Sequence, residues 1–154
     1  MLTADDRSKW DAYVKQEKHA IFYTTLIKKD EGWKLNKPFR NACQDTGLEA
    51  PNGMYDAIDP TDEFDVCDEG IVFTGCNLRF PYKYAQTSCV FYLPVHSFST
   101  AALGRPEPVT IPGQPLLGYF SRPRFSPDGS LIAFQRAPQG HSRDISIYIA
   151  KLDK

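Results

Sequence analysis

The sequence from residue 122 to residue 134 reads RPRFSPDGSLIAF. Its centre, Ser126-Pro127-Asp128-Gly129, has the composition of a tight turn. Proline fixes φ at the first turn position, aspartate bonds to its own backbone, and glycine adopts positive φ. Phe125 precedes this turn and the apolar residues 131–134 follow it. The stretch therefore predicts a hairpin of two packed strands, with the four turn residues in a structural role.

A related block lies upstream. Residues 64–73 read FDVCDEGIVF, again a strand, a polar turn with glycine, and a strand, and Gly70 and Gly129 are 59 residues apart. A strand with a tyrosine recurs as well, around Tyr23, Tyr92 and Tyr148. Periods of about 40–60 residues with about four strands each are typical of β-propeller blades.

Other apolar runs predict the remaining strands. Residues 19–27, 70–75 and 88–95 are apolar on both faces, which favours strands buried inside a stack of sheets. Shorter strands are expected at 33–35, 108–111, 123–126, 131–135 and 145–152. Residues 11–18 have apolar positions at helical spacing and indicate a short N-terminal helix.

The strands add up to an all-β fold, a partial β-propeller of about two blades of four-stranded antiparallel sheet. We expect residues 19–45 to end one blade, 63–112 to form a full blade, and 121–152 to supply three strands of the next. Blades pack face to face, so an isolated stretch leaves two faces uncovered. Residues 1–154 are therefore expected to form a single incomplete segment that self-associates when isolated.

Composition narrows the classes of partner. The chain has 18 Lys+Arg and 19 Asp+Glu, a net charge of −1, and this balance argues against nucleic acid. It contains no run of 18 apolar residues, so we expect no membrane partner. Neither a secretory signal nor an N-x-S/T sequon occurs, which favours the cytoplasm. Secretion is the alternative if the N-terminus is truncated.

Charge is unevenly placed along the chain. Residues 41–78 hold nine acidic residues and no Lys or Arg. We interpret this block as a solvated acidic loop, because the spacing of its acidic residues does not match that of a calcium-binding loop. The basic residues Arg122, Arg124, Arg136 and Arg143 flank the predicted strands and are interpreted as solvated strand edges.

The cysteines carry no metal signature. Cys43, Cys67, Cys76 and Cys89 contain no C-x-x-C pair, and their spacing is too irregular for a common zinc module. We interpret them as reduced thiols that pack like small apolar residues. No metal and no cofactor is expected.

Several segments of the sequence resemble a known protein family. Residues 122–134 resemble the blade motif of the prolyl oligopeptidase family of serine peptidases, a motif shared with TolB-like propellers. The order of the segments 10–14, 20–26, 46–49 and 64–73 resembles the N-terminal propeller of fungal dipeptidyl-peptidase V, to which acylaminoacyl-peptidase-like enzymes are similar. The resemblance spans residues 10–152. It implies a propeller that caps a C-terminal α/β-hydrolase domain and gates the access of short peptides. It also implies an alternative to the solvated loop, in which Asp62 and Glu63 orient the free α-amino group of a substrate, as paired acidic residues do in dipeptidyl peptidases.

In that family the nucleophilic serine lies in a G-x-S-x-G turn. None of the serines in this sequence has glycine at both −2 and +2, so no catalytic residue is carried over and the hydrolase domain is absent. We expect the chain to be inactive alone, with the missing blades, the hydrolase domain and the peptide substrate of the parent as its partners. The alternative is a stand-alone protein-interaction module. A small Cys or His enzyme is disfavoured, since no pattern places a cysteine beside a histidine.

Overall fold

The computed structural model describes residues 19–36, 38–51, 60–77, 88–95, 104–113, 118–138, 141 and 143–152. The helix expected at 11–18 lies outside these residues. The described elements are β1 (Phe22–Tyr23), β2 (Leu26–Lys29), β3 (Gly32–Leu35), β4 (Arg40–Asn41), β5 (Leu48–Glu49), the 3-10 helix η1 (Pro60–Glu63), β6 (Phe64–Cys67), β7 (Gly70–Asn77), β8 (Cys89–Pro94), β9 (Glu107–Pro108), β10 (Gly118–Phe125), β11 (Leu131–Pro138) and β12 (Ser146–Lys151).

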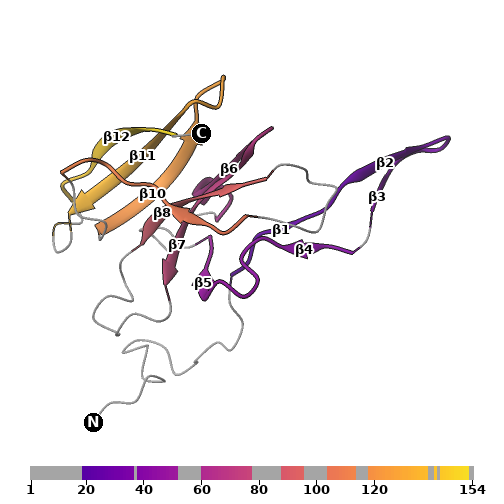
Figure 1. Cartoon of the computed structure of the whole chain (residues 1–154), viewed down its shortest axis with the longest axis horizontal. Helices are drawn as coiled ribbons and strands as arrows, with labels where there is room; N and C mark the ends of the chain where they lie inside the picture. The colour runs from indigo at the N-terminus through magenta and orange to yellow at the C-terminus, as the bar shows by residue number, and fades with distance from the viewer. Residues whose placement is uncertain are drawn as a thin grey trace, which may run out of the picture.

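The larger sheet is an antiparallel meander in which β6, β7, β8 and β9 follow one another in space as in sequence (Figure 1). β7 is its longest strand. β6 pairs with the half of β7 from Gly70 to Phe73, and β5 pairs with Cys76 and Asn77 beyond it. On the other side of the meander, β9 pairs with β8 at Phe91 and Tyr92.

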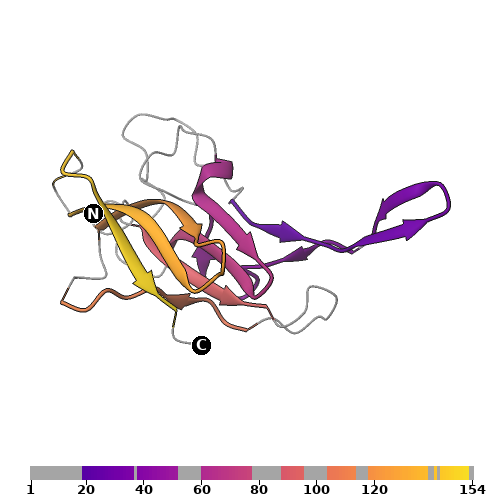
Figure 2. The same cartoon turned by 90° about the horizontal axis from the view of Figure 1, so that it is seen from above.

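The second sheet contains β10, β11 and β12, also antiparallel and in chain order. The predicted turn at Ser126–Gly129 joins β10 to β11. The register of β10 shifts between Ser121 and Arg124, which marks a β-bulge. Seen from above, this sheet lies across one face of the larger sheet (Figure 2).

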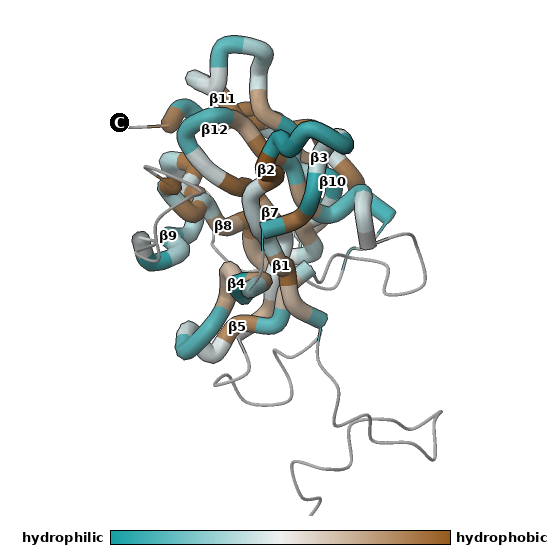
Figure 3. The backbone as a smooth tube through the Cα atoms, turned by 90° about the vertical axis from the view of Figure 1, so that its right-hand side faces the viewer, coloured by the Kyte–Doolittle hydropathy of each residue, from teal (hydrophilic) through white to brown (hydrophobic). Residues whose placement is uncertain are grey.

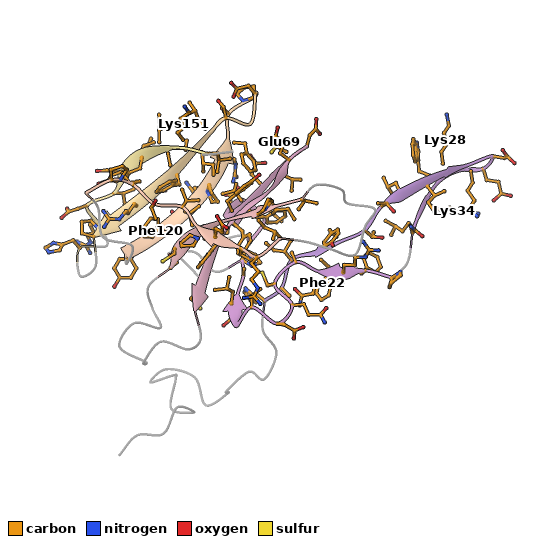
Figure 4. The ribbon with its side chains drawn as sticks, viewed as in Figure 1. Phe22, Lys28, Lys34, Glu69, Phe120 and Lys151 are labelled. Carbon is orange, nitrogen blue, oxygen red and sulfur yellow. The ribbon has the colours of Figure 1, made fainter. Side chains whose placement is uncertain are left out.

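A shared hydrophobic core fills the space between the two sheets. Its buried members come from both sheets and are Val72, Val90, Phe120, Ile132, Phe134 and Ala150. Phe120 of β10, labelled in Figure 4, stacks close to Phe134, with ring centroids 5.6 Å apart. Side chains alternate between the faces of a strand, so every second residue of β7 and β8 points into this core.

The opposite face of the larger sheet is also covered. A second core cluster joins residues of β7 and β8 to the N-terminal segment and contains Ile21, Ala42, Cys43, Ala50, Ile71, Phe73, Phe91, Leu93 and Val95. β7 and β8 are therefore buried on both faces, as their sequences predicted. The all-β, antiparallel fold class is confirmed, and the stacking of the two meanders is propeller-like.

The N-terminal segment differs from its prediction. A single strand over 19–27 with two buried faces is wrong, because the structure divides it into β1 and β2. β1 pairs with β4 and β2 with β3, which gives a projecting two-stranded ribbon (Figure 1). Leu26 is 58% exposed and Trp33 is 65% exposed. Apolar colouring on β2 is visible in Figure 3. An apolar run shows that a strand could be buried. Whether it is buried depends on other segments that pack against it, and the run itself does not identify them.

The repeat also has a different basis from the one the sequence suggested. Tyr92 and Tyr148 pack against the same inter-sheet core from opposite sheets, so they are not equivalent positions of two blades. The two turn glycines serve different purposes. Gly129 has φ +68, as a turn residue should, whereas a Cβ on Gly70 would lie 2.4 Å from the carbonyl oxygen of Leu93. What recurs is therefore the strand–turn–strand pattern, and neither the tyrosines nor the turn glycines occupy equivalent positions in it.

Candidate functional site

The clearest cluster of charged residues lies where the two sheets meet. It is formed by Asp62 and Glu63 of η1, Asp65 of β6, and Arg122 and Arg124 of β10, and we call it the acidic junction. The sequence separation of about 60 residues between its acidic and basic members equals the spacing of the repeated hairpins. The acidic residues at the first strand of one sheet thus meet the basic residues at the first strand of the next.

Glu63 is the buried member, with only 6% of its surface exposed. Its Oε2 accepts a hydrogen bond of 2.7 Å from Oγ1 of Thr74 and one of 3.2 Å from the backbone N–H of Arg122. Arg122 sits at the β-bulge with φ 53, a left-handed conformation that is unfavourable for a residue with a side chain. The Glu63 carboxyl group therefore satisfies the N–H that the bulge removes from the ladder.

Asp62 forms the exposed part of the junction. Its Oδ1 lies 3.0 Å from Nη2 of Arg124, and its Oδ2 lies 3.9 Å from Nε of Arg122. Nη1 of Arg124 also donates to the backbone oxygen of Asp62 at 2.8 Å. Nearby, Oδ2 of Asp65 accepts a 2.9 Å bond from the backbone N–H of Phe125. These bonds attach β10 to η1 and β6.

The role of Asp62 and Glu63 in binding a substrate amine stays a prediction. The structure brings the two residues together, and gives each carboxyl group partners from β10. An incoming ammonium group would have to displace Arg124 from Asp62 or enter the buried surroundings of Glu63. These contacts give both residues a role in joining the two sheets.

The arginines expected at solvated edges fall into different environments. Arg122 and Arg124 pair with Asp62, as described above. Arg136 is buried, and its guanidinium carbon lies 5.5 Å from the ring centre of Phe120 and 5.6 Å from that of Tyr148. For Arg136 the interpretation as a solvated edge is wrong, because its charge is held between aromatic faces. Arg143 is exposed.

The predicted turn is held by a network around Asp128. Its Oδ1 accepts bonds from Oγ of Ser126 at 2.6 Å and from the N–H of Ser130 at 3.1 Å. The N–H of Gly129 donates to the carbonyl oxygen of Ser126 at 2.8 Å, which closes the turn. These bonds join Ser126, Asp128, Gly129 and Ser130 within the turn.

The same bonds make the turn sensitive to acid. The hydrogen bond from Ser126, followed by those from Ser130, lowers the pKa of Asp128 from 3.8 to about 2. A lowered pKa in the folded state means that the stabilisation is complete above pH 3.8 and is lost as the pH falls through 2. We expect Asp128→Asn to lose less stability than the native chain over this pH range. Urea titrations at several pH values measure this, and equal losses in both proteins would contradict it.

Histidines and cysteines form no nucleophilic site in the part of the chain that the structure describes. Nδ1 of His19 lies 3.1 Å from the carbonyl oxygen of Pro51, and Nδ1 of His141 lies 3.5 Å from Asp144 at the surface. All four cysteines are free, with no disulfide between any two of them. Burial raises the pKa of Cys43 and of Cys89 to about 11, so both remain protonated thiols at neutral pH.

Among the described residues, no group of three or more His, Cys, Asp or Glu side chains is close enough to hold a metal ion. Within the same ranges, no helix has the length and apolarity needed to cross a membrane.

A cavity of about 770 Å³ lies between the base of the ribbon and β8. Arg40 of β4, Arg105 before β9, and Asp45 are its charged lining residues, and Tyr23 and Phe91 line it as well. This cavity was not predictable from the sequence, since its arginines are far apart in the chain and belong to no motif. None of its described lining residues is a serine, a cysteine or a histidine.

Comparison with protein-family models, with curated proteins and with solved structures finds no match to this chain.

Proposed function

We propose that the chain is a non-catalytic propeller segment of a serine exopeptidase of the prolyl oligopeptidase type, similar to dipeptidyl-peptidase V. In the parent protein it would cap the active site and restrict entry to short peptides. The observation that carries this proposal is the stacking of two antiparallel meanders through one core, with the acidic junction at their first strands. Stacked blades of this kind form the wall of a propeller.

The packing supports a structural rather than a chemical role. A cap has to exclude large substrates, and this requires a wall whose sheets do not slide over one another. Here the inter-sheet core and the bonds of the acidic junction hold the sheets in one register. By contrast, His19 contacts a backbone carbonyl oxygen, His141 lies at the surface, and Cys43 and Cys76 are buried.

Apolar residues are exposed on both outer surfaces, which supports the proposal that this chain is part of a larger parent protein. Ile147 and Ile149 of β12 are 75% and 64% exposed, and the ribbon exposes Trp33 on the other side of the molecule. Residues of this kind are normally covered in a folded protein, and neighbouring blades would cover them in a propeller. The partners proposed for this chain are therefore the remaining blades and the hydrolase domain.

A fluorophosphonate reagent, which labels activated serines, tests the proposal. An antibody against this chain is used to isolate the native polypeptide from its own cells. We expect the isolated polypeptide to be labelled and its sequence to contain a G-x-S-x-G motif outside these 154 residues. The purified chain of 154 residues serves as the control and should remain unlabelled. A native polypeptide without labelling and without the motif would overturn the proposal.

The second candidate is a stand-alone interaction module, and the ribbon favours it. Leu26 and Leu35 are cross-strand neighbours on β2 and β3, Trp33 is on the same face, and all three are exposed. Such an apolar face on a projecting hairpin is suited to binding another protein. The mass of the native polypeptide separates the two candidates, as described in the Discussion.

A further inference from the structure

The cavity between the base of the ribbon and β8 is lined by charged side chains that the fold does not use. Asp45 and Arg105 line it, and neither side chain forms an ion pair or a hydrogen bond with any residue that the structure describes. Its volume of about 770 Å³ is that of a small-molecule site. A cavity with a few convergent polar groups is the usual form of such a site.

The loop between β4 and β5 (Figure 1) holds Asp45 in place. The backbone N–H of Cys43 donates to Oδ1 of Asn41 at 2.8 Å, and Oγ1 of Thr46 donates to the carbonyl oxygen of Cys43 at 2.7 Å. Oγ1 of Thr46 also accepts a 3.1 Å bond from the N–H of Leu48. Asp45 has φ 60, a left-handed conformation that aspartate tolerates better than most residues. Because Cys43 is buried in the core, the loop is a rigid support for Asp45.

Arg105 belongs to the segment that leads into β9. Gly104 lies close against β8, since an added Cβ would be 2.8 Å from Cγ of Pro94. Pro106 follows Arg105 and favours an extended backbone for it. Just beyond, β9 pairs with β8 at Phe91, which also lines the cavity. Contacts on both sides of Arg105 thus fix its backbone, while the residue itself remains exposed.

The charge of the lining favours an anion. Arg40 and Arg105 supply two guanidinium groups against the single carboxylate of Asp45. Guanidinium groups bind carboxylates and phosphates through paired hydrogen bonds. Phe39 and Phe91 line the same cavity and provide aromatic surface for an apolar group. Phe39 is 48% exposed, so its ring is accessible to a ligand.

We propose that this cavity binds a small organic anion. Its carboxylate or phosphate group is bound by Arg105 and Arg40, and its apolar part lies against Phe39. The rigid loop and the anchored segment form the walls before the ligand arrives, so little ordering is needed on binding. The inference goes beyond the proposed function and does not rest on it, since a wall of stacked sheets requires no such ligand.

Equilibrium dialysis of the full chain with 3-phenylpropionate and with phenyl phosphate tests the site. This method counts the ligand bound per chain whether or not the chain self-associates. We expect saturable binding of one molecule per chain, and the tighter of the two anions identifies the head group. 3-Phenylpropylamine has the same apolar part with the opposite charge and should bind at least about tenfold more weakly. Acetate and inorganic phosphate lack the ring and should bind more weakly than their ring-bearing counterparts.

Two substitutions change the charge of the lining in opposite directions. Arg105→Gln removes a guanidinium group and should weaken anion binding by about tenfold. Asp45→Asn removes the opposing carboxylate, keeps a residue that tolerates the left-handed backbone, and should strengthen anion binding by about threefold. Arg143→Gln is the matched control, because Arg143 is also exposed but does not line the cavity. Circular dichroism verifies that all three variants fold.

Four results would each overturn the inference. The first is the absence of saturable binding of either anion. The second is an amine that binds as tightly as the anions, which would indicate adsorption to apolar surface. The third is equal weakening by Arg105→Gln and Arg143→Gln, and the fourth is weaker anion binding after Asp45→Asn. None of these results depends on fluorophosphonate labelling, so failure of the inference is distinguishable from failure of the proposed function.

Discussion

Replacing Glu63 by alanine is expected to lower the free energy of unfolding by about 2–4 kcal/mol. Its carboxyl group accepts bonds from the Thr74 hydroxyl and from the N–H of Arg122. Thr74 is completely buried, and in the variant its hydroxyl keeps only the more distant backbone oxygen of residue 63 as an acceptor, at 3.3 Å. The left-handed backbone at Arg122 would also lose the partner that holds it. Urea unfolding followed by tryptophan fluorescence and circular dichroism measures the effect.

The matched control for this variant is Glu63→Gln. Glutamine keeps the size of the side chain and one acceptor oxygen, so it should cost about 1 kcal/mol. If the alanine and glutamine variants were equally stable, the hydrogen bonds of Glu63 would not hold the sheets together. A loss below about 0.5 kcal/mol for alanine would contradict the described role of the acidic junction.

Replacing Phe134 by alanine is expected to cost more, about 3–5 kcal/mol. Phe134 is buried in the inter-sheet core, with its ring 5.6 Å from that of Phe120 and 6.2 Å from that of Tyr148. Its removal leaves a cavity between two sheets that are fixed by their own ladders and cannot close it completely. The same urea titration measures this loss.

Ile147→Ala is the control for Phe134→Ala. Ile147 lies on β12 next to Tyr148 but on the outer face, where it is 75% exposed. Its truncation should change stability by about 0.5 kcal/mol or less in the isolated chain. Comparable losses for the two variants would mean that the outer face of β12 is covered, and that the inter-sheet core is not the dominant one.

The sheets were predictable from sequence because their signals are local. The apolar runs at 70–75 and 88–95 indicated strands buried on both faces, and β7 and β8 are such strands. The turn around Asp128 was predictable residue by residue, since its hydrogen bonds join groups at most five residues apart. Local chemistry is what a single sequence records most directly.

The exposed ribbon and the acidic junction were not predictable, because both depend on contacts between residues that are far apart in the sequence. The apolar run at 19–27 resembles the runs at β7 and β8, but part of it projects into solvent on the ribbon. The acidic block was visible in the sequence, whereas its partners Arg122 and Arg124 lie about 60 residues away. Their separation equals that of the repeated hairpins, and this coincidence was the one signal from which the acidic junction could have been inferred.

The mass of the native polypeptide tests the central claim most directly. An antibody against residues 118–152 is used on a denaturing immunoblot of the cells that make the protein, with the purified chain of 17.4 kDa as the size standard. We expect one band several times heavier than the standard, because in the proposed parent the two stacked sheets are only part of a propeller that is joined to a hydrolase domain. A native band that migrates with the standard would contradict it and favour the stand-alone interaction module.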